Sequence, residues 1–176
     1  MYTRPVMAGL AIGGLLVGAG CSGESGSDAE APSATAPASP SSTLVAAEQD
    51  AITAYNALWQ SMAKAGEIPD PDAPELRQYA SGDALTRVVR ALVTYRETGV
   101  VTRGRPVNDP SVVSATATEV KLADCGDSTN WTTHTKSSGE PIEEDPRGRR
   151  RITATVNLAE NAWEVTSFHL EEIGSC

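Results

Sequence analysis

The chain has 176 residues, a formal net charge of −9 at pH 7 and 40% hydrophobic residues, which is enough to build one globular domain. An acidic balance of this size makes nucleic acid a poor partner and indicates that overall charge does not hold the chain to anionic surfaces. Two isolated histidines and three cysteines offer no familiar metal-ligand spacing, and we find no phosphate-binding loop and no nucleophile elbow. The sequence therefore predicts no catalytic residue, no metal site and no cofactor.

The first twenty residues have the order of an export signal. Arg4 precedes an apolar, glycine-rich run over 6–20 that meets Cys21. The run is shorter than the roughly 20 residues that a membrane-spanning helix needs, and its glycines weaken it further as a helix. Residues 1–20 are therefore predicted to be a signal peptide.

The residues before Cys21 resemble a bacterial lipobox, in which the cysteine after the cleavage site carries a lipid. Gly18 departs from that pattern, because an aliphatic residue is usual three places before the cysteine. We expect lipidation of Cys21 to hold the protein on the extracytoplasmic face of the cell membrane. A freely secreted protein is the alternative.

A low-complexity segment follows the cysteine. Residues 22–42 are almost wholly Ser, Gly, Ala, Pro, Thr and acidic residues, with nothing to bury. Such a composition predicts a flexible tether over 21–43, which suits a domain presented at a surface.

Cysteine parity agrees with export. If Cys21 carries a lipid, Cys125 and Cys176 remain as an even pair in an oxidising compartment. A disulfide between them would close a loop of about fifty residues and hold the C-terminus, which otherwise frays. Two free thiols are the alternative.

Residues 44–176 are predicted to form one domain that begins with helices. Apolar residues recur at helical spacing over 46–66 and again in a helix that opens at residues 81–83 and stops at Gly99. A proline-rich break separates them and leads into a short turn of helix over 75–79.

Beyond Gly99 the period changes from helical to alternating. Strands are predicted over 100–107, 112–124, 131–136, 150–158 and 163–173. The clearest alternation is in the fourth strand, with Ile152, Ala154, Val156 and Leu158 on one face, and residues 159–161 make a hairpin connection. Helices followed by an antiparallel meander predict an α+β domain with the helices on one face of the sheet.

Several short motifs carry a family resemblance. They are Tyr79-Ala80 with Ser81-Gly82, the run 103–113, Asp124-Cys125 with Trp131, residues 148–151, Trp163-Glu164-Val165 and residues 172–176. Together they resemble a group of actinobacterial secreted proteins and lipoproteins of unknown function. That group is similar to the cystatin-like cone superfamily, which includes nuclear transport factor two and ketosteroid isomerase. The resemblance implies a curved, mainly antiparallel sheet that wraps a long helix and encloses a pocket, but not a function.

Five residues could line such a pocket, although aromatic residues at helical spacing are more often core. They are Tyr55, Trp59, Tyr95, Trp131 and His169. The direction of His169 depends on whether a bulge separates the strand residues before and after it. His134 lies on the opposite face of its strand from Trp131 and is expected to face water if Trp131 points inward.

Two charged motifs have structural interpretations. Asp124 and Asp127 flank Cys125 and are expected to serve a turn rather than a proton transfer. The basic run 147–151 lies beside Glu143-Glu144-Asp145 and is expected to be a solvated hairpin end, the alternative being a site for an anionic envelope polymer or lipid headgroup.

The sequence thus predicts an exported, lipid-anchored envelope protein whose domain binds or contacts a partner without catalysis. The partner is expected to be an envelope protein or a small apolar ligand, in addition to the membrane itself. A ligand carrier or isomerase-like enzyme that uses the cone pocket is the alternative. A purely structural role, such as covering or inhibiting a neighbouring envelope protein, is a third possibility.

Overall fold

The computed structural model describes residues 40–143 and 146–176, so the predicted signal peptide, Cys21 and most of the predicted tether lie outside the described residues. The long helix α1 spans Pro40–Glu67, beginning six residues before the predicted start at residue 46. Residues 40–43 are therefore helical, which corrects their assignment to the tether. Proline is well suited to the first position of a helix, because its missing N–H is not needed there.

The other two helices agree with the sequence prediction. The short helix α2 spans Pro74–Tyr79 and the helix α3 spans Gly82–Thr98. Gly99 ends α3 in the left-handed conformation with φ of 68°, and its N–H donates to the carbonyl of Tyr95. Glycine adopts this conformation without the steric cost that a side chain would add.

In the described part of the chain, six strands follow the helices. They are β1 (Val100–Gly104), β2 (Ser111–Ala115), β3 (Glu119–Asp127), β4 (Trp131–Thr135), β5 (Arg149–Ala159) and β6 (Ala162–Leu170). The hairpin between β5 and β6 lies at the predicted position, with Ala159 paired to Ala162.

Three predicted strands are wrong in extent, and the last of them, expected to reach residue 173, ends at Leu170 in β6. The first was expected to reach residue 107, but β1 ends at Gly104, which has a φ of 75°. The second was expected to run unbroken over 112–124, but it is a hairpin of β2 and β3. Thr116 makes that turn, since its hydroxyl accepts the N–H of Glu119 at 2.9 Å. A run rich in Val and Thr favours strand on both sides of such a turn and does not reveal it.

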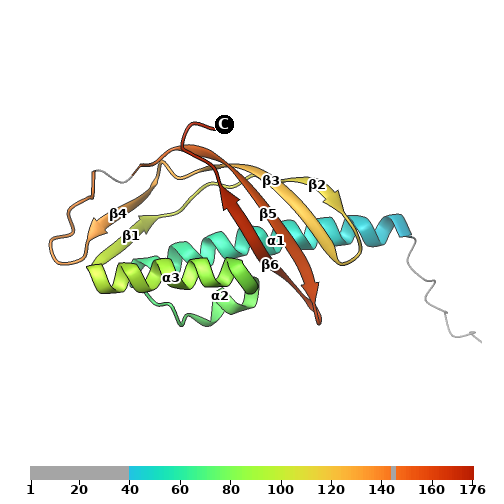
Figure 1. Ribbon diagram of the computed structural model, residues 1–176, viewed down its shortest axis with the longest axis horizontal. Helices are drawn as coiled ribbons and strands as arrows, with labels where there is room; N and C mark the ends of the chain where they lie inside the picture. Colours follow the sequence, from blue (N-terminus) through green and yellow to red (C-terminus); the bar gives the residue numbers. More distant parts are fainter. Residues whose placement is uncertain (1–39, 144–145) are drawn as a thin grey trace, which may run out of the picture. The chain divides into compact units, whose positions relative to one another are not determined.

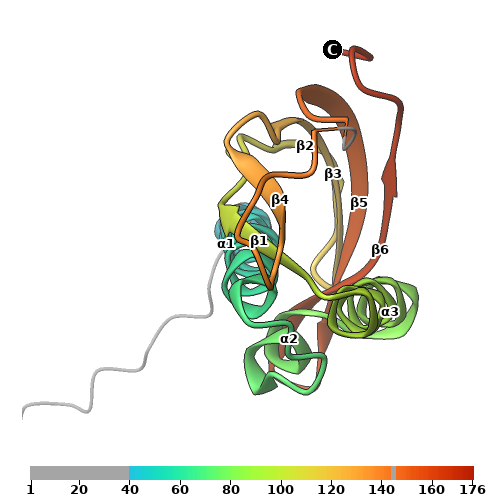
Figure 2. The same ribbon diagram turned by 90° about the vertical axis from the view of Figure 1, so that its left-hand side faces the viewer.

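The strands form two antiparallel sheets rather than one. The larger sheet has the order β2-β3-β5-β6, and the smaller one pairs β1 with β4. Helix α1 contacts strands of both sheets, while α3 packs mainly along β6 (Figures 1 and 2). The structure thus confirms an α+β fold with helices packed on antiparallel sheet.

Strand β6 contains the bulge on which the direction of His169 depends. The register shifts opposite Thr155 and Val156, so Thr166 is the extra residue. The bulge lets Val165 and Phe168 both face the core, where their exposed fractions are 0% and 9%. His169 is therefore turned outward and is exposed.

The core is centred on the indole of Trp59, which is 5% exposed. Its ring centroid lies 6.0 Å from that of Tyr55, 6.2 Å from that of Trp131 and 5.6 Å from that of Phe168. These contacts join α1 to β4 of the small sheet and to β6 of the large one. Edge-on and tilted packing of this kind is favourable for aromatic pairs.

Candidate functional site

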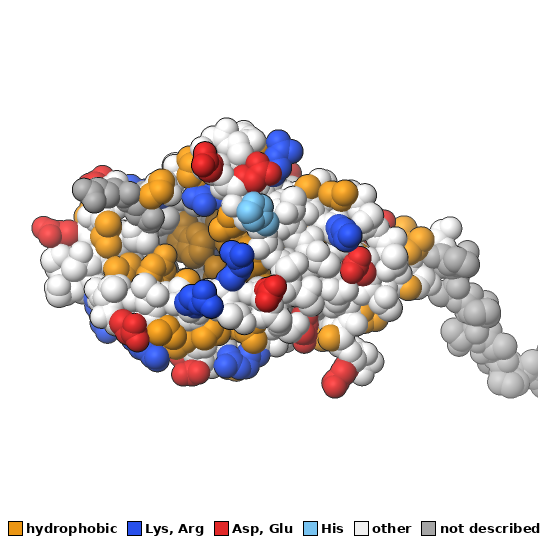
Figure 3. Space-filling model, viewed as in Figure 1, with side chains coloured by type: hydrophobic (Ala, Val, Ile, Leu, Met, Phe, Trp, Pro, Cys, Tyr) orange, Lys and Arg blue, Asp and Glu red, His pale blue; other side chains and the backbone are white. Residues whose placement is uncertain are grey.

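A cavity of about 160 Å³ opens between the two sheets. Its walls come from α1, α3, both sheets and the segments that connect their strands. The lining residues are Trp59, Tyr95, Thr102, Pro106, Asn108, Gly126, Ser128, Trp131, Thr133, Pro146, Arg147, Arg150, Ile152 and Leu170. Figure 3 shows an apolar hollow on this face of the molecule with basic side chains close to its rim.

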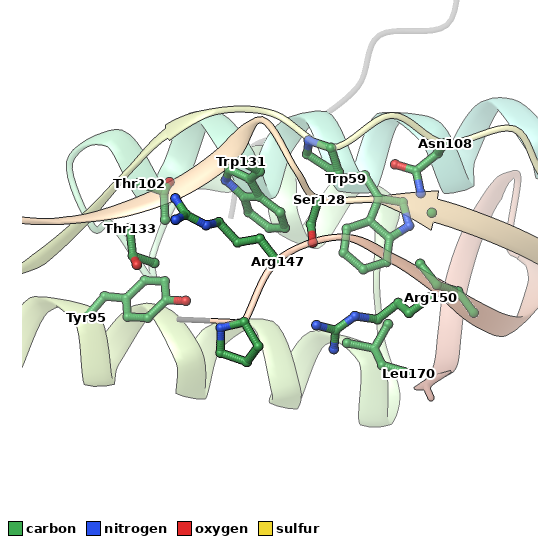
Figure 4. A pocket seen from close by; sticks show the side chains of 14 residues that line it. Trp59, Tyr95, Thr102, Asn108, Ser128, Trp131, Thr133, Arg147, Arg150 and Leu170 are labelled. Carbon is green, nitrogen blue, oxygen red and sulfur yellow. The ribbon is translucent and has the colours of Figure 1, made fainter. Parts of the chain in front are cut away.

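Two indoles form the main apolar wall of the cavity. Trp59 comes from the middle of α1, and Trp131 opens β4. Their rings meet edge to face, with an interplanar angle of 89°, so one presents a flat face where the other presents an edge. Figure 4 shows both indoles on the side of the cavity opposite Tyr95, which reaches in from α3.

Among the described residues, Arg147 and Arg150 are the charged ones that line the cavity, and both are half-buried. Neither forms an ion pair with a carboxylate of residues 40–143 or 146–176, whereas the neighbouring Arg151 lies 3.8 Å from Glu171. Strand alternation explains the difference, because β5 sends Arg150 to the same face as the buried Ile152 and sends Arg151 outward. The prediction that the whole basic run is a solvated hairpin end is therefore wrong for these two residues.

Two other polar residues of the wall are held by the fold. The Ser128 hydroxyl donates to the carbonyl of Gly148 at 3.1 Å and accepts its N–H at 3.2 Å. The side-chain amide of Asn108 donates to Asp124 Oδ2 at 2.6 Å. Both side chains therefore shape the cavity and hold its connecting segments in place.

Asp124 is a buried carboxylate directly behind the cavity wall, with an exposed fraction of 5%. It accepts the hydroxyl of Tyr55 at 2.9 Å, the amide of Asn108, and the backbone N–H of Asp109 at 3.0 Å. Burial and the charge of Asp124 both raise the pKa of Tyr55 well above its ordinary value, so the phenol keeps its proton. The carboxylate of Asp124 thus accepts three hydrogen bonds from the protein and does not line the cavity.

The two acidic residues beside Cys125 thus differ in role. Asp127 serves a turn as expected, since its carboxylate accepts the N–H of Thr129 at 2.8 Å. Hydrogen bonding from the side chain and then from the backbone of Thr129 lowers the pKa of Asp127. The expectation of a turn role is wrong for Asp124. The signal was present in β3, where the buried face through Val120 and Leu122 continues to Asp124 by strict alternation.

The five candidate pocket residues separate into three groups. Trp59, Tyr95 and Trp131 line the cavity. Tyr55 lies behind it, 1% exposed and bonded to Asp124. His169 lies outside it on the exposed face of β6, which corrects its place among the lining residues.

His134 also lies away from the cavity. It is half-buried on the face of β4 opposite Trp131 and Thr133, in agreement with the alternation. One ring nitrogen lies 2.8 Å from the Thr132 hydroxyl and the other 3.1 Å from the carbonyl of Gly139. The ring therefore braces the turn after β4.

Cys125 and Cys176 form a disulfide, with their Cα atoms 6.0 Å apart. The bond ties the C-terminal tail to β3, and the guanidinium of Arg149 donates to Cys125 Sγ at 3.3 Å. The tail also continues the pairing with β5, since the Gly174 N–H donates to the carbonyl of Arg149 at 2.7 Å. The predicted disulfide is confirmed. It fixes the C-terminal tail at the end of the large sheet that lies nearest the cavity.

Within the described part of the chain, no three His, Cys, Asp or Glu side chains gather as a metal site would require. None of the described helices has the length and apolar character needed to cross a membrane.

Comparisons with known proteins found no matching protein-family profile and no matching curated protein. Among solved structures, the chain is similar to the intermembrane-space region of the chloroplast protein ARC6, with 19% identity and a TM-score of 0.47 over 69% of this chain and 95% of that one. It is also similar to a Nostoc punctiforme protein of unknown function with a cystatin-like fold, with 10% identity and a TM-score of 0.44 over 72% of this chain and 91% of that one. Similarity at this level identifies neither a family nor a function.

Proposed function

We propose that this protein is exported, is held on the outer face of a membrane by a lipid on Cys21, and binds a small ligand in the cavity between its two sheets. The observation that carries the binding function is the cavity of about 160 Å³, with an indole wall formed by Trp59 and Trp131 and two guanidinium groups at its edge. Small-molecule sites are typically concave, mainly apolar and supplied with a few polar groups that orient the ligand.

The state of the nearby polar groups supports binding over catalysis. A general base or nucleophile has to be within reach of the ligand and able to take part in proton transfer or attack. The Ser128 hydroxyl is bonded twice to Gly148, and the carboxylate of Asp124 is behind the wall with three donors. These groups serve the structure of the site.

The proposed location is supported by the sequence of the N-terminus and by the disulfide. The order of a basic residue, an apolar run and Cys21 is that of a lipoprotein signal. The bond between Cys125 and Cys176 fits an oxidising compartment, because disulfides are rare in the reducing cytosol.

Ligand binding can be tested with the full chain carrying Cys21→Ser and Trp163→Phe, which leaves Trp59 and Trp131 as the two reporters among the three tryptophans. A library of single-ring and short aliphatic compounds should contain members that change the indole fluorescence and raise the melting temperature together. In the matched control, Trp59→Phe and Trp131→Phe remove the indole wall, so the same compounds should raise the melting temperature less.

The same experiment distinguishes a domain that binds a small ligand from a domain that contacts a protein partner. If no compound changes either signal, while crosslinking on intact cells recovers one dominant protein, the domain contacts a protein partner and the ligand-binding proposal fails.

The anchor is tested in the native host. Cys21→Ser should move the protein from the membrane fraction to the medium, whereas the neighbouring Ser22→Ala should leave it in the membrane fraction. Retention of the Cys21→Ser protein in the membrane would contradict the lipid anchor.

A further inference from the structure

We infer that the ligand of this cavity is an anion, namely a carboxylate carried on a single ring. This inference rests on the proposed function and adds the chemical class of the ligand. It starts from the charges that face the cavity, which are the guanidinium groups of Arg147 and Arg150. No Asp or Glu of residues 40–143 or 146–176 lines it, although the chain as a whole has a net charge of −9.

The two guanidinium groups are partly removed from water, and no carboxylate of the described residues serves as their counter-ion. Both side chains are half-buried, and neither is paired with a carboxylate in the described part of the chain. A partly desolvated charge without a partner is unfavourable, and a bound anion would remove that cost. Arginine suits this task, because its planar fork matches the two oxygens of a carboxylate.

Their neighbours on the chain show that this arrangement is specific to the cavity. Arg149 donates to the disulfide sulfur of Cys125, and Arg151 lies beside Glu171 and donates to the carbonyl of Ser175. Only the members of the run that face the cavity are left without a partner among the described residues. The fold therefore directs two positive charges that have no ion-pair partner among residues 40–143 and 146–176 to a cavity that also has an indole wall.

Figure 4 shows how the two kinds of group are combined. The side chain of Arg147 extends along the side of the cavity where Trp131 lies, and Arg150 lies toward Leu170 and Trp59. A ligand that contacts both arginines is therefore also in reach of the indoles. This geometry favours a molecule with an anionic end and a flat apolar body, because stacking on indole is strongest for planar groups.

The volume of the cavity matches an apolar body of one ring. An engineered protein cavity of about 150 Å³ holds one benzene molecule. The cavity here, at about 160 Å³, has room for a ring with a short carboxylate arm. Benzoate and phenylacetate are therefore suitable probes, and benzamide and benzyl alcohol are their uncharged counterparts.

Calorimetric titration of the full chain carrying Cys21→Ser with these four compounds tests the inference. We expect benzoate or phenylacetate to bind at least about tenfold more tightly than the uncharged compounds. The reason is that only a carboxylate forms a charge-assisted hydrogen bond with a guanidinium group. Binding should also weaken as salt rises from 20 to 200 mM, as estimated from the screening of partly exposed charges. Equal affinity for benzoate and benzamide would overturn the anion inference while leaving the proposed ligand-binding function intact.

Variants of the basic run localise the charge recognition. Arg147→Gln and Arg150→Gln should each lower carboxylate affinity about tenfold and leave benzyl alcohol binding unchanged, while Arg151→Gln on the same strand should change neither. If Arg151→Gln weakens binding as much as Arg150→Gln, the effect is one of general charge and the inference fails. The comparison of the four compounds uses a chain in which both arginines are intact, so its result holds even if an arginine variant folds poorly. If none of them nor any library compound binds, the proposed function fails as well.

Discussion

Tyr55 and Asp124 are 69 residues apart in the sequence, yet their side chains meet in the core, where the phenol donates to Asp124 Oδ2 at 2.9 Å. The pair joins the middle of α1 to β3 of the large sheet. Asn108 adds the connecting segment between β1 and β2 through the same carboxylate oxygen. One buried acceptor thus fixes a helix, a strand and a loop behind the cavity wall.

Removing the phenol hydroxyl should cost stability. Tyr55→Phe leaves a buried carboxylate one donor short, and we expect a loss of about 1–3 kcal/mol in the free energy of unfolding. Tyr79→Phe is the matched control, because Tyr79 is half-buried and its hydroxyl has no hydrogen-bond partner among the described residues. Urea denaturation followed by circular dichroism measures both. Equal losses in the two variants would show that the contact with Asp124 contributes nothing.

The same pair predicts how stability depends on alkaline pH. Burial, and then the charge of Asp124, raise the pKa of Tyr55 in the folded state above the value of about 10 that an unfolded tyrosine has. A group whose folded pKa is raised stabilises the protein fully below its unfolded pKa, and the contribution is lost as pH rises above it. This linkage predicts that the free energy of unfolding falls as pH rises from about 10 to about 11.5. The fall should be less steep in Tyr55→Phe than in Tyr79→Phe, because only the second variant keeps the buried phenol. Parallel pH profiles in the two variants would refute this role for Tyr55.

Hydrophobic periodicity predicted the helices and the last hairpin of the chain. Strand alternation also places two charged residues on inward faces of the sheet, close to the cavity. The helices and the β5–β6 hairpin were predicted because their apolar faces repeat without interruption. Continuing the buried face of β5 back from Ile152 leads to Arg150, and continuing that of β3 forward from Leu122 leads to Asp124. A charged residue on an inward face is the pattern that marks a functional or buried polar site.

Other features depend on contacts that sequence periodicity does not contain. Strand β1 ends at Gly104, which has a positive φ and lies close to the backbone of Asn130 in a distant segment. The cavity is the space left between Trp59, Trp131 and Tyr95, whose distances depend on the packing of three separate elements. Such relationships are decided by tertiary structure, which overrides local preference.

The disulfide should be a major source of stability. Cys125 and Cys176 are separated by 51 residues, and closing a loop of this length stabilises by about 4 kcal/mol in the chain-entropy model. The double variant Cys125→Ser, Cys176→Ser should lose about that amount in urea denaturation. Reductant should destabilise the unmodified chain and have no effect on the variant. Hydrogen exchange should also speed up at the Gly174 amide, which is bonded to Arg149; unchanged exchange there would show that the tail is held without the bond.

Two glycines in the left-handed conformation, Gly99 and Gly104, allow the stability cost of backbone strain to be measured apart from that of a steric collision. Gly99 has a φ of 68° and no atom within 4 Å of where a Cβ would be, so Gly99→Ala should cost only the backbone strain of about 1–2 kcal/mol. Gly104 has a φ of 75°, and there an added Cβ would collide with the backbone carbonyl oxygen of Asn130, which cannot rotate away as a side chain would. Gly104→Ala should therefore cost about 1–3 kcal/mol more than Gly99→Ala, the usual range for overpacking.

Because the collision in Gly104→Ala lies at the start of β4, the same variant should shift the Trp131 fluorescence and weaken ligand binding, whereas Gly99→Ala should leave both unchanged. Equal effects of the two substitutions would mean that the approach of β1 to Asn130 does not position the indole wall.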